Sequence, residues 1–516
     1  MTDGSTLDFW DFTVRQLIGM VESKEISSRE LVEGVLRKIE DLNPALNAFV
    51  AFDGSRAMEE AAQADEGIAH GRSGPLAGIP FAVKDMEDAA GFVTSFGSAT
   101  HQNDPPSQRD SLLVRRLRGA GAIVVGKTAC PEFGLKPQTD SPAFGITRNP
   151  WNLDRTPAGS SGGTVAALAA GIIPFATGSD GGGSIRIPAA VTGLSGFKPT
   201  LGRVPMGDPS APGWNFLSTR GPMARRIGDV AFLLDLVVGS DPHDTRSLPD
   251  KTILWADAIA SPRPPARVAW CPTLGYAQVD TEIREICEAA LKLMADQGTE
   301  VVHLDSVFDV DPGPALGAMV STYIHRLIEP LRDTPMWDRL DPLVVISGEI
   351  AKMNVSALDL VAAEDHCHRL SWELAELFEQ FDLLLCPTVC GTTPPCLMPM
   401  SVAEVMALFG SLDMPTDIDP VFLQSLFEWL QSKEPFNLPL GTIDGSPTLE
   451  WTRLTQPFNM TRSPAGTVCA GLTSDGMPVG LQVVGPWLGD LEVLNAIALF
   501  EQVLEDLPHP PMINKG

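Results

Sequence analysis

Two glycine-rich turns within residues 156–205 constrain the fold of this chain more than any other feature. Ser160 and Ser161 precede two glycines in the first turn, and Ser184 follows three glycines in the second. The small residues 165–171 between the turns are typical of a helix that packs closely against its neighbours. Most Gly/Ser clusters are flexible loops, but apolar segments flank both turns, so we expect them to lie inside a packed domain.

The second turn favours nucleophilic catalysis. Glycine permits the sharp bends that turn several N–H groups toward one point, and such a nest stabilises an oxyanion that develops on a substrate carbonyl. The candidate donors are the backbone amides of Gly181, Gly182, Gly183 and Ser184. A serine at such a nest is a natural nucleophile, provided that a base can take its proton.

Histidine has no sequence support as that base. None of the eight histidines lies in the serine region or in a helpful local motif. Residues 159–163 satisfy the G-x-S-x-G pattern, which marks a nucleophile elbow only when a strand precedes it. The preceding residues 149–158 contain two prolines and are predicted to form a loop, so the sequence does not favour an elbow.

Lys84 is the better candidate for the base. It lies at the end of residues 78–85, a short apolar strand that closes with the charged pair Lys84–Asp85. Burial lowers the pKa of a lysine and can make it a general base. The residues alone leave a second interpretation open, in which Lys84 merely pairs with Asp85 or caps the strand.

Four motifs, in this order, resemble the amidase signature family, whose members hydrolyse amides with a Ser–cis-Ser–Lys triad. They are GIPFAVKD at 78–85, AGSSGG at 158–163, DGGGSIRIPA at 180–189 and GFKPTLGRV at 196–204. The resemblance implies that Lys84 is the base, that Ser160 is the bridging serine with a cis peptide bond, and that Ser184 is the nucleophile.

The chain departs from the family pattern at two positions near these motifs. Ala158 stands where the family usually has glycine, and Ser179 stands where threonine is common. Neither position belongs to the implied triad. Because alanine carries a Cβ atom, we expect the backbone at Ala158 not to adopt a positive φ.

The resemblance implies an α/β fold, a single large domain in which helices cover a mostly parallel, twisted mixed β-sheet. Residues 110–127 follow a helix–turn–strand pattern that also favours parallel pairing. Residues 1–73 are predicted to be an N-terminal helical region packed on the core, with a capped helix at 27–51 and a second helix at 55–72. Residues 74–516 are predicted to be the amidase signature catalytic domain.

Two segments of that domain, residues 305–350 and 396–450, lack clean hydrophobic periodicity and diverge from the family pattern. Long aperiodic segments in compact domains are often lids or binding loops, so we expect both to contribute to the substrate pocket. Variable surface packing is an equally open interpretation. The resemblance implies that Phe133, Gly134 and Leu135 also line this pocket.

The composition excludes several classes of partner. A chain of 516 residues, 44% of them hydrophobic, is ample for a globular core, and its formal net charge of −28 argues against binding nucleic acid. The acidic N-terminus lacks the pattern of a secretory signal, and the longest apolar run, residues 165–176, is too short to span a bilayer. We therefore expect a cytoplasmic protein with no membrane partner, and a homodimer is left open.

The cysteines do not predict a metal site or a disulfide framework. Eight of them are scattered along the chain. Cys386, Cys390 and Cys396 follow residues 366–368, His-Cys-His, but their spacing matches no common zinc pattern. We expect buried thiols, and we expect no metal or other cofactor.

The expected activity is hydrolysis of a small amide. Neutral Lys84 is expected to draw a proton through Ser160, so that Ser184 attacks the carbonyl carbon and forms an acyl-enzyme. The expected substrate is uncharged and hydrophobic or aryl, such as an anilide or a carbamate. Two other functions stay open: the A subunit of a glutamyl-tRNA amidotransferase complex, and a non-catalytic binding protein on the same scaffold.

Overall fold

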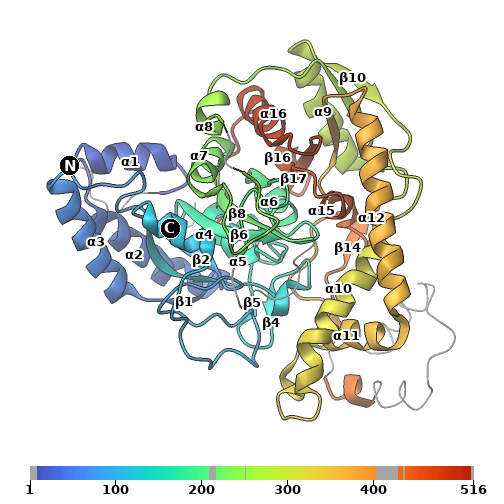
Figure 1. Ribbon diagram of the computed structural model, residues 1–516, viewed down its shortest axis with the longest axis horizontal. Helices are drawn as coiled ribbons and strands as arrows, with labels where there is room; N and C mark the ends of the chain where they lie inside the picture. The colour runs from blue at the N-terminus through green and yellow to red at the C-terminus, as the bar shows by residue number, and fades with distance from the viewer. Residues whose placement is uncertain (1–7, 208–216, 250–251, 402–427, 434–435, 513–516) are drawn as a thin grey trace.

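Strands from distant parts of the chain form two mixed sheets in the computed structural model (Figure 1). The structure describes residues 8–207, 217–249, 252–401, 428–433 and 436–512. Among these residues the first sheet has the strand order β1 (Phe49–Phe52), β3 (Ile123–Thr128), β2 (Pro80–Lys84), β6 (Phe175–Asp180) and β8 (Thr219–Ala224). Its central strands β3, β2 and β6 are parallel, so Lys84 and Asp180, the last residues of β2 and β6, lie at the same edge of the sheet.

The second sheet has the described strand order β10 (Glu300–His303), β9 (Arg267–Trp270), β11 (Leu383–Pro387), β17 (Pro478–Val484), β16 (Ala465–Leu472) and β7 (Gly196–Lys198). Strands β10, β9 and β11 are parallel, and the remaining pairs are antiparallel. Strand β7 lies beside β8, so the two sheets meet there. The predicted α/β domain with a mixed sheet is confirmed, with the parallel pairing gathered at the centre of one sheet and one side of the other.

Two short buried helices follow the two serine turns. Helix α5 (Gly162–Ala169) packs against β2, β3 and β6, and α6 (Arg186–Thr192) packs against β16 and β17. A Cβ atom on Gly163 would lie 2.3 Å from the backbone nitrogen of Ala129, so only glycine lets α5 approach this closely. The prediction of a closely packed helix between the turns is confirmed, although the helix begins at Gly162 rather than at residue 165.

The N-terminal helices α1 (Val14–Glu22), α2 (Ser28–Leu46) and α3 (Gly54–Ala69) lie together at one side of the molecule (blue in Figure 1). The predicted cap of α2 is present, because Ser27 Oγ accepts the Glu30 N–H at 3.1 Å and Glu30 Oε2 accepts the Ser27 N–H at 2.8 Å. The prediction that this helix continues to residue 51 is wrong. Asn47 is left-handed with φ 52°, which ends α2, and the chain then forms β1 at the edge of the first sheet.

On the opposite side of Figure 1 lie α10 (Gly313–Ile328), α11 (Pro342–Asn354) and α12 (Ala357–Phe378). Much of residues 305–350 is therefore helical, where an irregular segment was expected. Leu316, Met319, Ile324 and Ile328 of α10 are buried at helical spacing, so the helix has an apolar face that the sequence prediction missed. Within residues 396–450 the structure describes two short antiparallel pairs, β12 (Pro399–Met400) with β13 (Phe436–Asn437) and β14 (Gly441–Ile443) with β15 (Ser446–Thr448). Residues 402–427 and 434–435 lie outside the described part.

Most of the remaining helices pack around the sheets, and one of them, of four residues, is itself buried. They are α4 (Leu112–Gly119), α7 (Ile227–Val237), α8 (Trp255–Ala258), α9 (Thr281–Asp296), α15 (Pro457–Met460) and α16 (Asp490–Val503). Helices α9 and α16 pack on β16, and α7 packs on β8. None of the described helices combines the length and the apolar character that crossing a membrane requires.

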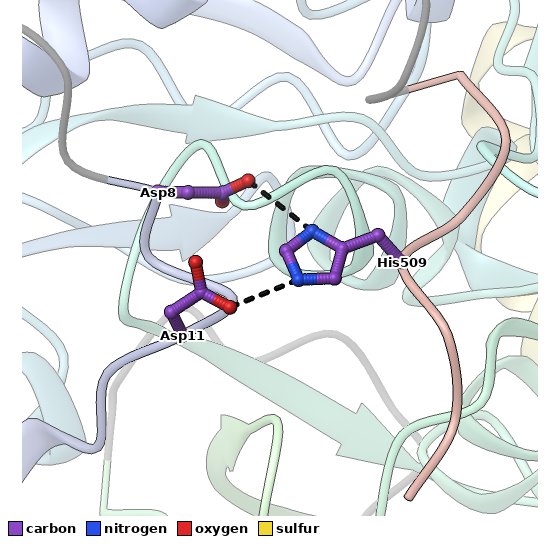
Figure 2. A group of neighbouring side chains, drawn as sticks. All are labelled: Asp8, Asp11 and His509. Carbon is purple, nitrogen blue, oxygen red and sulfur yellow. Dashed lines mark ion pairs between the residues drawn. The ribbon is translucent and has the colours of Figure 1, made fainter.

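The two ends of the described chain meet at His509 (Figure 2). Its Nε2 lies 2.9 Å from Asp11 Oδ1, and its Nδ1 lies 3.6 Å from Asp8 Oδ2. The imidazole ring also packs against Trp10, with 5.9 Å between the ring centroids. These contacts tie the C-terminal tail to the segment that precedes α1.

Candidate active site

Lys84 lies at the centre of a cluster of hydroxyl groups. Its side chain is fully buried at the end of β2, and Nζ lies 2.8 Å from Ser160 Oγ, 2.9 Å from Ser161 Oγ and 2.9 Å from Ser179 Oγ. Burial disfavours the charged ammonium and lowers the pKa of Lys84 from 10.5 to about 8. A substantial fraction of this side chain is therefore neutral near physiological pH.

Asp85 does not pair with Lys84, which was the alternative that the sequence left open. The Asp85 carboxylate accepts hydrogen bonds from the Ser95 side chain and backbone, and it lies 3.4 Å from Lys127 Nζ. Lys127 is itself held by the carbonyl oxygen of Glu87 at 2.5 Å. Asp85 and Lys127 thus have partners other than Lys84, and the Nζ of Lys84 lies among hydroxyl groups.

The first serine turn presents Ser160 to Lys84. The peptide bond between Gly159 and Ser160 is cis, and Ser161 is the N-cap residue of α5. The expectation for Ala158 is wrong, because its φ is 63°. Its carbonyl oxygen accepts a hydrogen bond from Thr139 Oγ1 at 2.8 Å, and its methyl group is fully buried in an apolar cluster, so tertiary contacts hold the left-handed conformation.

The second serine turn is organised by the buried carboxylate of Asp180. It accepts the Gly183 N–H at 2.8 Å, the Ile185 N–H at 3.2 Å and the Arg186 Nε–H at 2.9 Å. Asn459 Nδ2 donates to the same carboxylate at 2.9 Å. Burial by itself raises the pKa of Asp180, but the charge and hydrogen bonds of Arg186 outweigh it and hold that pKa well below its usual range.

Of the four predicted oxyanion donors, one is already engaged in a hydrogen bond within the protein. The Gly183 N–H is engaged by Asp180, whereas within the described chain no protein acceptor is seen for the amides of Gly181, Gly182 and Ser184. Thr455 Oγ1 donates to the Gly182 carbonyl oxygen at 2.6 Å, which orients the next peptide group. The Ser161 N–H donates to the Ser184 carbonyl oxygen at 3.3 Å, so the two serine turns touch.

A cavity of about 630 Å³ opens onto the half-buried Ser184. Gly134 and Leu135 line it, as expected, together with Gly159 and Gly182. Phe133 is not among the lining residues, because its ring packs into an apolar cluster with side chains of α10 and α11. The segments in which we expected pocket residues supply, among others, the lining residues Asp311, Leu316, Val320, Leu449 and Glu450.

Several residues of the site carried no clear signal in the sequence. Ser161 lies inside one of the recognised motifs and Ser179 directly precedes another, but nothing there indicated that both contact Lys84. Arg453 lines the cavity in contact with Asp311 and lies 2.8 Å from Glu450 Oε2. Arg453 and Asp311 are 142 residues apart, so their pairing has no local signature.

Two clusters of potential metal ligands occur among the described residues, and both lie outside this cavity. They are Asp8, Asp11 and His509, and His325, Glu329 and Glu349. In the first cluster the two ring nitrogens face different carboxylates, and in the second Arg332 pairs with both glutamates. Neither cluster includes the three cysteines Cys386, Cys390 and Cys396, which are buried free thiols.

Known proteins resemble the chain over most of its length. Residues 30–441 match the family described as Amidase. An acylamidase of Rhodococcus erythropolis is 31% identical over 497 residues, which cover 95% of this chain and 94% of the relative. The crystal structure of a bacterial aryl acylamidase of the amidase signature family has a TM-score of 0.81 and 27% identity, and covers 95% of this chain and 96% of that chain.

The structure of 6-aminohexanoate cyclic dimer hydrolase in complex with its substrate gives a TM-score of 0.81 at 29% identity, covering 98% of this chain and 100% of that chain. Sequence and fold thus agree across both sheets and both serine turns. The chain belongs to the amidase signature family, and it is an amidase, a hydrolase of carbon–nitrogen bonds in amides other than peptide bonds.

Proposed function

We propose that this amidase hydrolyses small, uncharged amides with a hydrophobic or aryl group through an acyl-enzyme on Ser184. One observation carries the proposal. The buried Nζ of Lys84 lies 2.8 Å from Ser160 Oγ, in the turn that contacts Ser184 at the floor of the cavity. A base with a pKa of about 8 in that position suits proton transfer near neutral pH.

The chemistry begins with neutral Lys84. Its Nζ takes the proton of Ser160 Oγ while Ser160 takes the proton of Ser184 Oγ, and Ser184 attacks the amide carbonyl carbon. The amides of Gly182 and Ser184 then stabilise the oxyanion, and one such donor contributes about 3 kcal/mol. The same relay in reverse delivers a proton to the departing nitrogen, because an amine leaves poorly as an anion. Water hydrolyses the acyl-enzyme and restores Ser184.

The lining of the cavity supports an uncharged substrate. Leu135, Ile187, Leu316 and Val320 contribute apolar surface. The charged Arg453 is held by two carboxylates of the same cavity, and Lys136 is held by Asp140 and Asp341. A substrate charge would therefore have to compete with these ion pairs. The names of the similar acylamidase and aryl acylamidase agree with an acylated amine or aniline as substrate.

A panel of amides, anilides, esters and carbamates, varied separately on the acyl and the amine side, tests the proposal on the purified chain. We expect turnover of neutral anilides and, in Ser184→Ala, a loss of at least about 10³-fold in kcat with an unchanged melting temperature. A fluorophosphonate should label Ser184 in the unmodified protein. Full activity of Ser184→Ala would reject the acyl-enzyme, and hydrolysis that appears only with a partner subunit would favour the amidotransferase function.

A further inference from the structure

A second cavity lies beside the catalytic one. It is a groove of about 790 Å³ between α10, α11 and α12, the three helices at the right of Figure 1. Each helix supplies part of the wall, for example Ala318 from α10, Ile346 from α11 and Ala362 from α12. Cavities of a few hundred to a thousand Å³ are of the size that binds small molecules.

The groove and the catalytic cavity adjoin along one strip of α10. Asp311, Pro314 and Gly317 line both of them. Pro314 and Gly317 are exposed, and a Cβ atom placed on Gly317 would meet no other atom within 4 Å. The space over this strip is thus open, and a chain bound at Ser184 can cross it into the groove.

The groove has an apolar wall with a buried polar atom that has no partner. Alanines, isoleucines and two valines make up much of the lining, including Ala315, Ile350 and Val355. His366 also lines it, is only 9% exposed, and its Nε2 has no hydrogen-bond partner among the described residues. Burial and the nearby Arg369 lower the pKa of His366, which keeps the imidazole neutral. A buried polar atom without a partner is unfavourable, so a ligand that satisfies Nε2 would be favoured there.

We propose that the groove is a distal subsite of the amidase, which takes elongated amides with an apolar chain and a second hydrogen-bonding group that reaches His366. The scissile amide lies at Ser184, the chain crosses the Pro314–Gly317 strip, and the distal group bonds His366 Nε2. The carboxylates of Asp311 and Asp359 in the same lining disfavour an anionic tail, and His366 Nε2 selects an amide, hydroxyl or ether. This subsite rests on the proposed function, because the near end of the substrate must reach Ser184.

Chain length is the first test. Two series of unbranched substrates are measured, p-nitroanilides with longer acyl chains and acetamides with longer N-alkyl chains. Each methylene that enters the groove should raise kcat/KM about fourfold, the value expected for burying a CH₂ group, until the groove is full. This increase in kcat/KM should appear only in the series whose alkyl chain points toward α10.

Substitutions in the groove are the second test. Ala362→Trp on α12 and Ala318→Leu on α10 narrow the groove without lining the catalytic cavity. We expect the ratio of kcat/KM for decyl to ethyl substrates to fall at least tenfold in both. The matched control is Val361→Trp, because Val361 is 54% exposed and does not line the groove, and its ratio should equal that of the unmodified protein.

His366→Phe tests the polar end, because phenylalanine keeps the ring and removes Nε2. Substrates with a distal amide are compared with analogues that have methylenes in its place. The unmodified protein should prefer the distal amide about tenfold, as expected for one hydrogen bond to a buried group, and His366→Phe should lose that preference. An unchanged preference in His366→Phe would overturn the role of His366.

The subsite and the proposed function can fail separately. If short amides are hydrolysed but neither series depends on chain length, the subsite is wrong and the function stands. If no amide is hydrolysed, calorimetry decides, with decanamide compared with propanamide and N-decylacetamide compared with N-ethylacetamide. Each pair is bound to Ser184→Ala and to Ser184→Ala/Ala362→Trp. Tighter binding of the longer amide in either pair that the second substitution removes supports the subsite, and equal binding within both pairs overturns it.

Discussion

Two buried lysines at this site have opposite electrostatic surroundings. Lys84 has three serine hydroxyls around its Nζ, and burial lowers its pKa to about 8. Lys136 is also buried, but the carboxylates of Asp341 and Asp140 outweigh that burial and raise its pKa above the ordinary value. Of these two lysines Lys84 is the one that becomes neutral near physiological pH. Burial also lowers the pKa of Lys198, to about 7, but the serine hydroxyls surround Lys84, so Lys84 is the lysine suited to act as the base.

If Lys84 is the base, as proposed, the pH dependence of hydrolysis should follow from its pKa. The base acts in its neutral form, which falls about tenfold for each pH unit below about 8. We expect kcat/KM for an anilide to rise about tenfold per unit up to about pH 7.5 and to level off above about pH 8.5. Lys84→Arg, which stays charged, should lose about 10³-fold or more in kcat/KM at every pH. A rate that is constant from pH 6 to pH 9 in the unmodified protein would exclude Lys84 as the base.

The buried Asp180–Arg186 pair should dominate stability near the second serine turn. Asp180→Asn leaves the Arg186 guanidinium buried without a counter-ion, so the free energy of unfolding in urea should fall by about 3–5 kcal/mol. The surface pair Arg15–Asp257 provides the control, because both side chains are about half exposed and Asp257→Asn should change stability by less than about 1 kcal/mol.

The lowered pKa of Asp180 also predicts how the stability contributed by this pair changes with pH. The folded state holds the pKa of Asp180 below its unfolded value, so the stabilisation is present above about pH 4, the unfolded pKa, and is lost as the pH falls below it. Urea unfolding from pH 7 to pH 3 should therefore show a stability loss that is smaller in Asp180→Asn. An equal acid loss in both proteins would contradict this assignment.

At the scale of elements, the turn from β6 into α6 positions the amides beside Ser184. Gly183 has φ 134°, which favours glycine, and a Cβ atom there would lie 2.2 Å from Thr455 Oγ1. Gly182 lines the catalytic cavity, and a Cβ atom on it would meet only Leu316 Cδ2 at 3.9 Å. Gly183 is thus required by its backbone conformation and its close contact, whereas Gly182 faces the open cavity.

This difference predicts the effect of alanine at each position. Gly183→Ala should lower the free energy of unfolding by about 1–3 kcal/mol and reduce kcat, because strain and collision displace the turn. Gly182→Ala should melt like the unmodified protein, since its methyl group enters open space. Thermal melts and steady-state rates of the two variants check this, and equal melting temperatures would refute the role of the Gly183 conformation.

At the scale of the whole molecule, the chain ends lie against each other. His509 in the C-terminal tail contacts Asp8 and Asp11 before α1, and Lys38 of α2 lies 3.4 Å from Asp8. The tail after α16 is thereby held on the N-terminal region, which also supplies the edge strand β1. The N-terminal helices and the C-terminal tail therefore stabilise each other.

Removing this contact should loosen the tail without unfolding the protein. His509→Ala should speed amide hydrogen exchange in residues 504–512 several-fold, while the global free energy of unfolding changes by about 1 kcal/mol or less. His243→Ala is the matched control, because His243 pairs only with Asp241 two residues away, at 2.8 Å. Exchange in the tail that is the same in both variants would show that His509 does not hold it.

The sequence correctly predicted the structural elements that depend on interactions between neighbouring residues. The Ser27 cap of α2, the buried strand that ends at Lys84 and the helix between the serine turns follow from neighbouring residues, and all are present. The length of α2 was mistaken because a left-handed Asn47 ended it. The helices of residues 305–350 were missed although the buried Leu316, Met319, Ile324 and Ile328 of α10 lie at helical spacing.

By itself the sequence determined the family, the two serine turns and the lysine that belongs with them, since each depends on motifs of a few consecutive residues. Only the tertiary structure decided what surrounds them. Strand pairing brings Ser160 to Lys84 across 76 residues and turns Ser161 and Ser179 toward the same nitrogen, while Phe133 packs away from the cavity. Burial and side-chain contacts depend on the whole packed chain, and for that reason they set the pKa of Lys84 and join the groove of His366 to the catalytic cavity.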